Sequence, residues 1–218
     1  MLGPPGVGKG TQAEMLSQQL HACHLSTGDV FRAAAKHHDC MASPALAQAI
    51  ELMHQGKLVP DGLVFALVAE RTTCLHCSGG FILDGFPRSL QQANDFDALL
   101  ERLNLQLDAV VSYTLSIEET INRVSGRLTC SKCHTVYHLE SKAPATPGIC
   151  DRCGNALTRR HDDHPEAIRV RLQEYAAITE PLVEHCRQKG NLLNISAASS
   201  PAGVLATTLT GLYALAHR

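Results

Sequence analysis

Tryptophan is absent from this sequence of 218 residues, and only five phenylalanines and four tyrosines supply aromatic rings. Neither sign of charge dominates, because the formal net charge at pH 7 is −2. Proteins that bind nucleic acid without sequence preference combine a basic groove with aromatic rings on which bases stack. The composition therefore argues against a nucleic-acid-binding protein.

Long apolar runs are also missing, since none approaches the roughly 18 residues that a transmembrane helix requires. We find no leader of charged, then apolar, then small residues, so we expect a cytoplasmic protein. Hydrophobic residues make up 44% and charged residues 18%, as is ordinary for a globular protein. The length is sufficient for one domain with a full core and small insertions.

Short apolar segments alternate with stretches of helical periodicity along most of the chain. The segments 80–83, 109–115 and 192–195 are typical of buried strands in a parallel sheet. Helices are predicted over residues 11–20, over 30–55 with a break near Pro44, from Asp61, and from about Pro165 to Pro181. Such alternation predicts an α/β fold with a central, mostly parallel sheet flanked by helices.

A phosphate-binding loop is predicted at the start of the chain, where residues 3–11 read GPPGVGKGT. Glycines allow successive backbone N–H groups to converge on phosphate oxygens, and the N-terminus of the following helix adds a positive field. A lysine at this spacing binds the β- and γ-phosphates. The alternative, a simple turn before a helix, does not explain the lysine and threonine. The predicted phosphate ligands are Gly6, Gly8, Lys9, Gly10 and Thr11.

Four of the nine cysteines form two close pairs, Cys130 with Cys133 and Cys150 with Cys153. This spacing is typical of a structural zinc site in which four thiolates surround one Zn²⁺. The pairs lie within residues 128–160, which are rich in Cys, Pro, Gly and Thr and interrupt the α/β alternation as an insertion. Disulfides or free thiols remain the alternative.

The order of these motifs resembles that of adenylate kinase, in its long form with a zinc-type lid, over nearly the whole chain. The displaced hydroxyl of Gly8-Lys9-Gly10-Thr11 is one mark of that family. The other matching segments are Ser26-Thr27-Gly28-Asp29 with Arg32, Asp84-Gly85-Phe86-Pro87-Arg88 with Gln92, the pair Arg123 and Arg127, and the group Arg160, Asp162, Asp163 and Arg171.

The resemblance implies a P-loop NTPase core with two insertions. The core would comprise residues 1–25, 56–126 and 161–218, with a helical NMP-binding segment at 26–55 and a small zinc-ribbon-like lid at 127–160. It also implies reversible, Mg²⁺-dependent transfer of the γ-phosphoryl group of ATP to AMP, giving two ADP, by a monomer. The implied partners are thus ATP, AMP and ADP, with Mg²⁺ and a structural Zn²⁺ as cofactors.

The resemblance also implies roles for individual residues. The catalytic set would be Lys9, Asp84, Arg88, Arg123, Arg160 and Arg171. Arg32 and Arg88 would hold the AMP phosphate, and Asp84 would hold the waters of Mg²⁺. Arginine suits such sites because its planar fork grips phosphate at two points and stays ionised. The remaining predicted nucleotide contacts are Arg127 together with Arg123 and Arg160 over ATP, Thr27 and Gln92 at the AMP base, and Val59 and Gly85.

Three departures leave alternatives open. Leu128, next to Arg127, replaces an arginine common in the family, and residues 195–198 lack its usual acidic-glycine pair near the adenine. GTP remains the alternative to ATP as donor, because the family's contacts to the donor base are largely made by backbone. Another nucleoside monophosphate kinase, a nucleic-acid-binding module with a Cys₄ ribbon, and a binding-only relic are the rival functions. Only Met1 and Leu2 precede Gly3, although a phosphate loop follows a central strand. We therefore expect the natural start to lie upstream.

Overall fold

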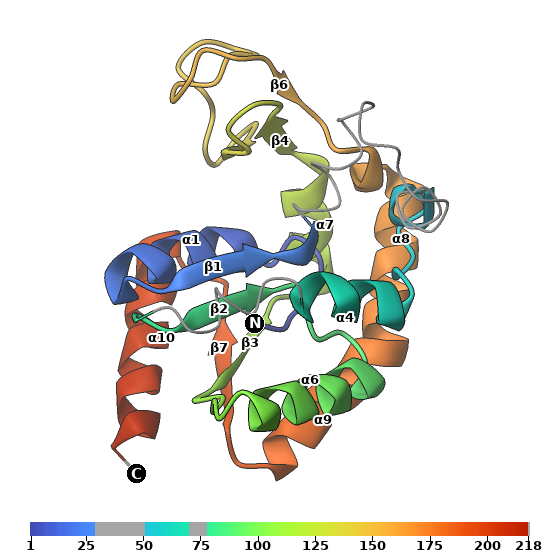
Figure 1. Cartoon of the computed structure of the whole chain (residues 1–218). Helices are drawn as coiled ribbons and strands as arrows, with labels where there is room; N and C mark the ends of the chain where they lie inside the picture. Colours follow the sequence, from blue (N-terminus) through green and yellow to red (C-terminus); the bar gives the residue numbers. More distant parts are fainter. Residues whose placement is uncertain (29–50, 70–77, 218) are drawn as a thin grey trace.

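The computed structural model describes residues 1–28, 51–69 and 78–217 (Figure 1). The predicted helix over 30–55 lies mostly outside these residues. The described elements, in chain order, are α1 (Lys9–Leu20), β1 (Cys23–Ser26), α4 (Asp61–Ala69), β2 (Phe81–Asp84), α6 (Leu90–Arg102), β3 (Val110–Thr114), α7 (Ile117–Ser125), β4 (Arg127–Cys130), β5 (Val136–His138), β6 (Leu157–Thr158), the 3₁₀ turn η1 (His161–Asp163), α8 (Pro165–Glu174), the π-helical turn η2 (Tyr175–Thr179), α9 (Glu180–Gln188), β7 (Leu192–Ser196) and α10 (Pro201–Ala216).

The core strands pair in parallel, as predicted for an α/β fold. Strand β1 pairs with β2 in a register that places Ser26 opposite Asp84, and β3 pairs with β7. The predicted strands correspond to β2, β3 and β7. Strand β1 was not predicted, because its four residues include a histidine and show no clear apolar alternation.

Met1 and Leu2 connect the two pairs of strands. The amino group of Met1 donates to the Leu83 carbonyl of β2 over 2.7 Å. On the other side, Leu2 N donates to Val111 O over 2.8 Å, and Tyr113 N donates to Leu2 O over 3.0 Å. Two residues thus bond to β2 and β3 in the manner of a strand lying between them.

A cavity of about 780 Å³ lies beside Met1 and Leu2. Its wall combines both pairs of strands with the helices around them, through side chains that include Phe81, Leu83, Val110, Leu107 and Leu212. A protein interior is normally packed almost without voids, and a cavity destabilises the folded state roughly in proportion to its volume. This side of the core is therefore underpacked.

Two apolar clusters hold the strands to their helices. Leu25, Leu83, Phe86 and Phe96 pack together between β1, β2 and α6, and the rings of Phe86 and Phe96 meet edge to face with centroids 5.4 Å apart. On β3 and β7, Tyr113 and Ile195 pack with Val204 of α10 and with Val7 of the first loop. Burial of Val7 anchors that loop against the carboxyl ends of β3 and β7.

The cysteine-rich insertion forms a small antiparallel sheet in the order β5-β4-β6. Figure 1 shows it standing away from the core, joined to α7 on one side and η1 on the other. The helix predicted to end at Pro181 instead continues: α8 passes through η2 into α9, where Pro181 lies in the first turn, directly after the π-helical residues. Among the described residues, no helix has both the length and the apolar character needed to cross a membrane.

Filling the cavity is expected to stabilise the protein. A variant extended by about four apolar residues before Met1 can pair with both β2 and β3 and place side chains in the cavity. Each buried side chain contributes on the order of 1.5–3 kcal/mol, so the melting temperature is expected to rise by several degrees. The control is an extension of equal length made of glycine and serine. Equal melting temperatures for the two extensions would contradict the prediction.

Candidate functional site

The loop before α1 has the backbone conformation that phosphate binding requires. Gly6 and Gly8 have φ of +79° and +101°, a region that favours glycine. A Cβ on Gly6 would lie 2.3 Å from Val124 Cγ2, so no larger residue fits there. Gly8 caps α1 without a side-chain hydrogen bond, and Gly10 and Thr11 lie in the first helical turn. The backbone N–H groups of a first helical turn have no acceptor within their own helix, so this turn could bind an anion in the predicted way.

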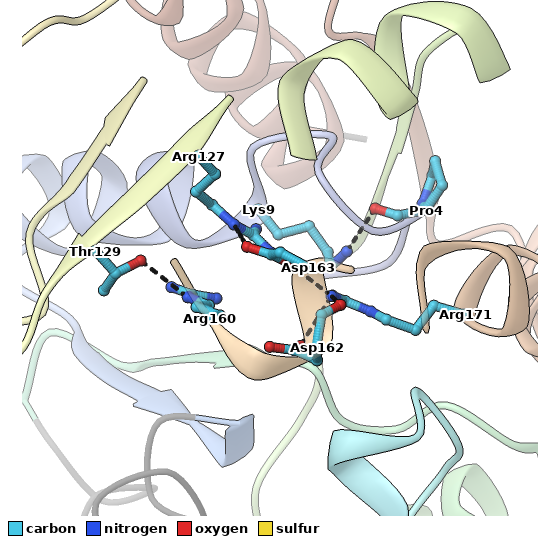
Figure 2. A network of polar contacts seen from close by, with 8 residues as sticks. All are labelled: Pro4, Lys9, Arg127, Thr129, Arg160, Asp162, Asp163 and Arg171. Carbon is cyan, nitrogen blue, oxygen red and sulfur yellow. Dashed lines mark hydrogen bonds and ion pairs between the residues drawn. The ribbon is translucent and has the colours of Figure 1, made fainter. Parts of the chain in front are cut away.

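Lys9 folds back over this loop. Its Nζ donates to the carbonyls of Gly3 and Pro4 over 2.7 and 2.9 Å, and Figure 2 shows the contact with Pro4. Burial lowers the pKa of Lys9 to about 7, while the nearby Asp84 carboxylate raises it and the charges of Arg88, Arg171 and Arg127 lower it further. Lys9 therefore lies in the combined field of four other predicted site residues.

Asp84 ends β2 and faces the first turn of α1. A Cβ built on Gly10 would lie 3.4 Å from Asp84 Oδ2, which shows how closely the carboxylate approaches the helix backbone. Parallel strands present their carboxyl ends at one edge of a sheet, where ligands of α/β proteins bind. Asp84 could hold Mg²⁺ there, since carboxylate oxygen is the ligand that this cation prefers.

Two aspartates hold two arginines at the base of the lid. The Asp163 carboxylate accepts from Arg127 Nε over 2.8 Å and also from Arg127 Nη2. Arg171 Nη1 lies 3.2 Å from Asp163 Oδ1 and 2.8 Å from Asp162 Oδ2. Burial lowers the pKa of Arg171 to about 10, and the charge of Asp162 opposes that shift. Figure 2 shows this group beside Lys9.

Arg123 and Arg160 approach from α7 and from the end of the lid. Arg123 donates to the carbonyl of Ala197 over 2.8 Å and to that of Val7 over 3.4 Å. Arg160 Nε donates to Thr129 Oγ1 over 3.0 Å. Arg123 is therefore held against the phosphate loop, and Arg160 against a lid strand.

A second cavity lies on the other side of the arginine cluster. Arg88 Nε and Thr27 Oγ1 both donate to Gly85 O, over 2.8 and 3.1 Å. Arg32 was predicted here and lies outside the described residues. The cavity wall contains six predicted site residues: Thr27, Val59, Gly85, Arg88, Gln92 and Arg171.

The four lid cysteines converge as a metal site requires. Their sulfurs all lie within 4.8 Å of one another, and the Sγ–Sγ distances include 3.4 Å between Cys130 and Cys153. Zinc–sulfur bonds of about 2.3 Å in a tetrahedron place sulfurs roughly 3.8 Å apart, so these distances fit a metal site and exclude disulfide bonds. Hydrogen bonding to Thr135 lowers the pKa of Cys133 to about 6, which favours its thiolate, whereas burial and hydrogen bonds from the other cysteines raise the pKa of Cys153 to about 11.

Sequence reasoning missed two residues that support the second cavity. Asp61 Oδ1 accepts from Gln92 Nε2 over 2.6 Å, and Thr179 Oγ1 donates to the carbonyl of Arg88 over 3.0 Å. Both partners are more than thirty positions away in sequence, and neither residue type is unusual where it stands. Only the tertiary structure brings these pairs together.

Comparison with known proteins identifies the family. The adenylate kinase family model matches residues 1–191. This chain belongs to the adenylate kinase family. It is 45% identical over 212 residues to the adenylate kinase of Syntrophotalea carbinolica, an alignment that covers 97% of this chain and 96% of the relative. It is 42% identical over 208 residues to that of Anaeromyxobacter sp. (strain K), covering 95% of each chain.

The family membership confirms the resemblance seen in the sequence and the P-loop NTPase fold class that it implied. It also places the chain among the nucleoside monophosphate kinases, as predicted. A third relative, from Carboxydothermus hydrogenoformans, is 41% identical over 212 residues and is matched over 97% of both chains.

Removing the charge of Asp163 is expected to destabilise the adenylate kinase fold. The Asp163 side chain is 1% exposed and faces two arginines, so Asp163→Asn removes the buried negative charge that both of them face. The free energy of unfolding is expected to fall by about 3 kcal/mol. Asp97→Asn is the matched control, because the Asp97–Lys189 pair is exposed, and its effect is expected to stay below about 1 kcal/mol. Denaturant titration measures both, and equal losses would contradict the prediction.

Proposed function

We propose that this chain catalyses the reversible transfer of the γ-phosphoryl group from ATP to AMP, giving two ADP. The observation that supports this most is the position of Arg171. It lines the cavity that contains Arg88 and Gln92, and its charge also acts on Lys9 of the phosphate loop. A phosphoryl group transferred from the phosphate loop to this cavity would therefore stay close to positive charge from both.

On the donor side, the loop N–H groups around Gly6, Gly8 and Gly10 would bind the ATP phosphates, with Thr11 in the first turn of α1. Lys9 would exchange its two carbonyl partners for phosphate oxygens. Since burial has lowered the pKa of Lys9 to about 7, a polyphosphate would raise it again and favour the charged ammonium. Additional positive charge would come from the three lid-side arginines, Arg123, Arg127 and Arg160.

On the acceptor side, Arg88 would hold the AMP phosphate, and Thr27 and Gln92 would contact the base. Val59 and Gly85 complete the wall of the same cavity. AMP is favoured as acceptor over the pyrimidine nucleotides, because a hydroxyl and a carboxamide can both bond to an adenine edge. Buried polar groups left without partners by a wrong base would make that discrimination large.

The reaction needs positioning and charge rather than a general base. An oxygen of the AMP phosphate, already anionic, forms the new bond to the γ-phosphorus while the bond to the β-phosphate oxygen of ATP breaks, and the electron pair of that bond stays with ADP. Lys9 and Arg171 would stabilise the negative charge shared by the three equatorial oxygens. Asp84 would hold the waters of Mg²⁺, which would supply further neutralisation of the phosphate charge.

The division into a core, an NMP-binding segment at 26–55 and a lid at 127–160 is part of the proposal. Support comes from the position of the lid ribbon, which stands away from the core in Figure 1. The Arg127–Asp163 pair links the two segments that connect the lid to the core, because Arg127 begins β4 and Asp163 ends η1. Lid closure over bound nucleotides would exclude water from the transfer. A monomeric state is proposed from the family default.

Structural Zn²⁺ in the lid is also proposed. Cys130, Cys133, Cys150 and Cys153 would hold it, and the backbone N–H of Lys132 already donates to Cys130 Sγ over 3.4 Å. Four thiolates leave no open coordination position for catalysis. The apolar core of the lid is small, consisting of Tyr137 with two of the cysteines and a few half-buried residues. A metal would therefore supply much of the stability of the lid.

Incubation of the purified protein with ADP and Mg²⁺ tests the reaction. ATP and AMP are expected to accumulate in equal amounts by chromatography. Lys9→Ala is expected to lower the rate by at least about a hundredfold, the scale seen when one preorganised charge is lost. Unchanged melting temperature in the variant would show that the fold is intact. Hydrolysis without equal formation of ATP, or no turnover by the folded wild type, would contradict the proposal.

Zinc content and chelation test the lid. Metal analysis is expected to find about one zinc per chain, and Cys150→Ser is expected to lose it. Chelation is expected to lower the melting temperature, because metal binding contributes folding free energy to small metal-bound units. The matched control is Cys186→Ser, since Cys186 is buried in the core far from the four-cysteine group along the chain. Full zinc occupancy in Cys150→Ser would contradict the assignment.

A further inference from the structure

Gln92 is held at both ends of its carboxamide. The side chain lies on α6, is buried, and lines the proposed acceptor cavity. Its Oε1 accepts from the backbone N–H of Arg88 over 2.7 Å, and its Nε2 donates to Asp61 Oδ1 over 2.6 Å. A backbone N–H can only donate and a carboxylate can only accept, so these partners determine which end of the amide is oxygen.

Asp61 is itself held in place. Its other oxygen, Oδ2, accepts from Ser89 Oγ over 2.8 Å. Ser89 is the N-cap of α6, and its Oγ accepts from the backbone N–H of Gln92 over 3.1 Å. Asp61, Ser89 and Gln92 therefore form a closed circuit of hydrogen bonds that links the start of α4 to the start of α6.

The circuit leaves a defined set of hydrogen-bonding groups on Gln92. A carboxamide has two N–H donors and two acceptor lone pairs, and Asp61 and Arg88 use one of each. One N–H and one lone pair remain in a fixed order. For a base held in one orientation, that order can pair with the edge of a 6-aminopurine, which offers an N6–H donor beside the N1 acceptor. A 6-oxopurine offers the reverse, an O6 acceptor beside an N1–H donor.

We propose that Asp61 is a positioning residue for acceptor specificity, which holds the Gln92 carboxamide in the orientation that pairs with a 6-aminopurine and opposes a 6-oxopurine. The carboxylate does this because a flipped carboxamide would set its oxygen against Asp61 Oδ1, two acceptors in contact. Such a contact excludes the wrong base by repulsion as well as by lost bonding. The proposal rests on the acceptor site proposed above.

Asp61→Asn tests the proposal with AMP and IMP as alternative acceptors, ATP as donor. IMP differs from AMP only at the purine 6-position and N1, so the pair isolates the edge that faces Gln92. Asparagine has nearly the same shape but can donate as well as accept, so it removes the repulsion that the carboxylate exerts on a flipped Gln92 amide and leaves the backbone N–H of Arg88 as the remaining group that orients it. The ratio of kcat/KM for AMP to that for IMP is expected to fall about tenfold, the effect of one misplaced hydrogen bond. The change is expected in KM for AMP, with kcat and the KM for ATP nearly unaltered.

Asp95→Asn is the matched control. Asp95 Oδ1 accepts from Gln91 Nε2 over 2.9 Å on the exposed face of the same helix, so the chemistry is the same and the cavity is not involved. Its AMP-to-IMP ratio is expected to equal that of the wild type. Ser89→Ala, which releases Asp61 Oδ2 and also removes the N-cap bond from the Gln92 backbone N–H, is the second variant and is expected to lower the ratio by a smaller factor. It carries the test if Asp61→Asn does not fold.

Gln92→Met separates this proposal from the acceptor site itself. Loss of discrimination in Gln92→Met with an unchanged ratio in Asp61→Asn would overturn the positioning role and leave the site standing. An unchanged ratio in Gln92→Met would overturn the acceptor site. A parallel loss of activity toward AMP and IMP in Asp61→Asn would make Asp61 merely structural and would also overturn the proposal.

Discussion

The concentration of positive charge around one phosphate-sized space is the constraint on which the rest of this site depends. The charges of Arg127 and Arg171 lower the pKa of Lys9, and the charge of Arg127 lowers that of Arg171. Without nucleotide, such a group is stable only when carbonyl dipoles and carboxylates compensate it. The Gly3 and Pro4 carbonyls compensate Lys9, and Asp163 compensates both arginines. Bound phosphate would replace these partners. The same positive charges would then stabilise the fold without nucleotide and bind phosphate when nucleotide is present.

Packing beneath the site is uneven. Val7 anchors the phosphate loop on Tyr113 and Ile195, yet the neighbouring cavity of about 780 Å³ lies between the strands that support it. Met1 and Leu2 join those strands through backbone hydrogen bonds to Leu83 and Val111. The loop geometry is therefore maintained by local glycine conformations and by one well-packed cluster rather than by the whole sheet.

Local motifs account for most of what could be predicted. The loop at residues 3–11 and each close pair of cysteines are short, local motifs. Short-range sterics and ligand chemistry dictate their residue types. Strands β2, β3 and β7 were found because they are continuous apolar runs. Strand β1 was missed because its four residues carry no such pattern. The continuation of α8 through η2 into α9 was missed because Pro181 indicated an end, whereas proline is also favoured in the first turn of a helix.

The sequence by itself determined the family and predicted the phosphate loop and the four-cysteine site, because each rests on short motifs in which neighbouring residues act together. Only the tertiary structure decided which aspartate meets which arginine and which group orients Gln92. Asp61 and Gln92 are far apart along the chain, as are Arg127 and Asp163. No local propensity encodes such pairs, since they form only after α4, α6 and the base of the lid have packed together.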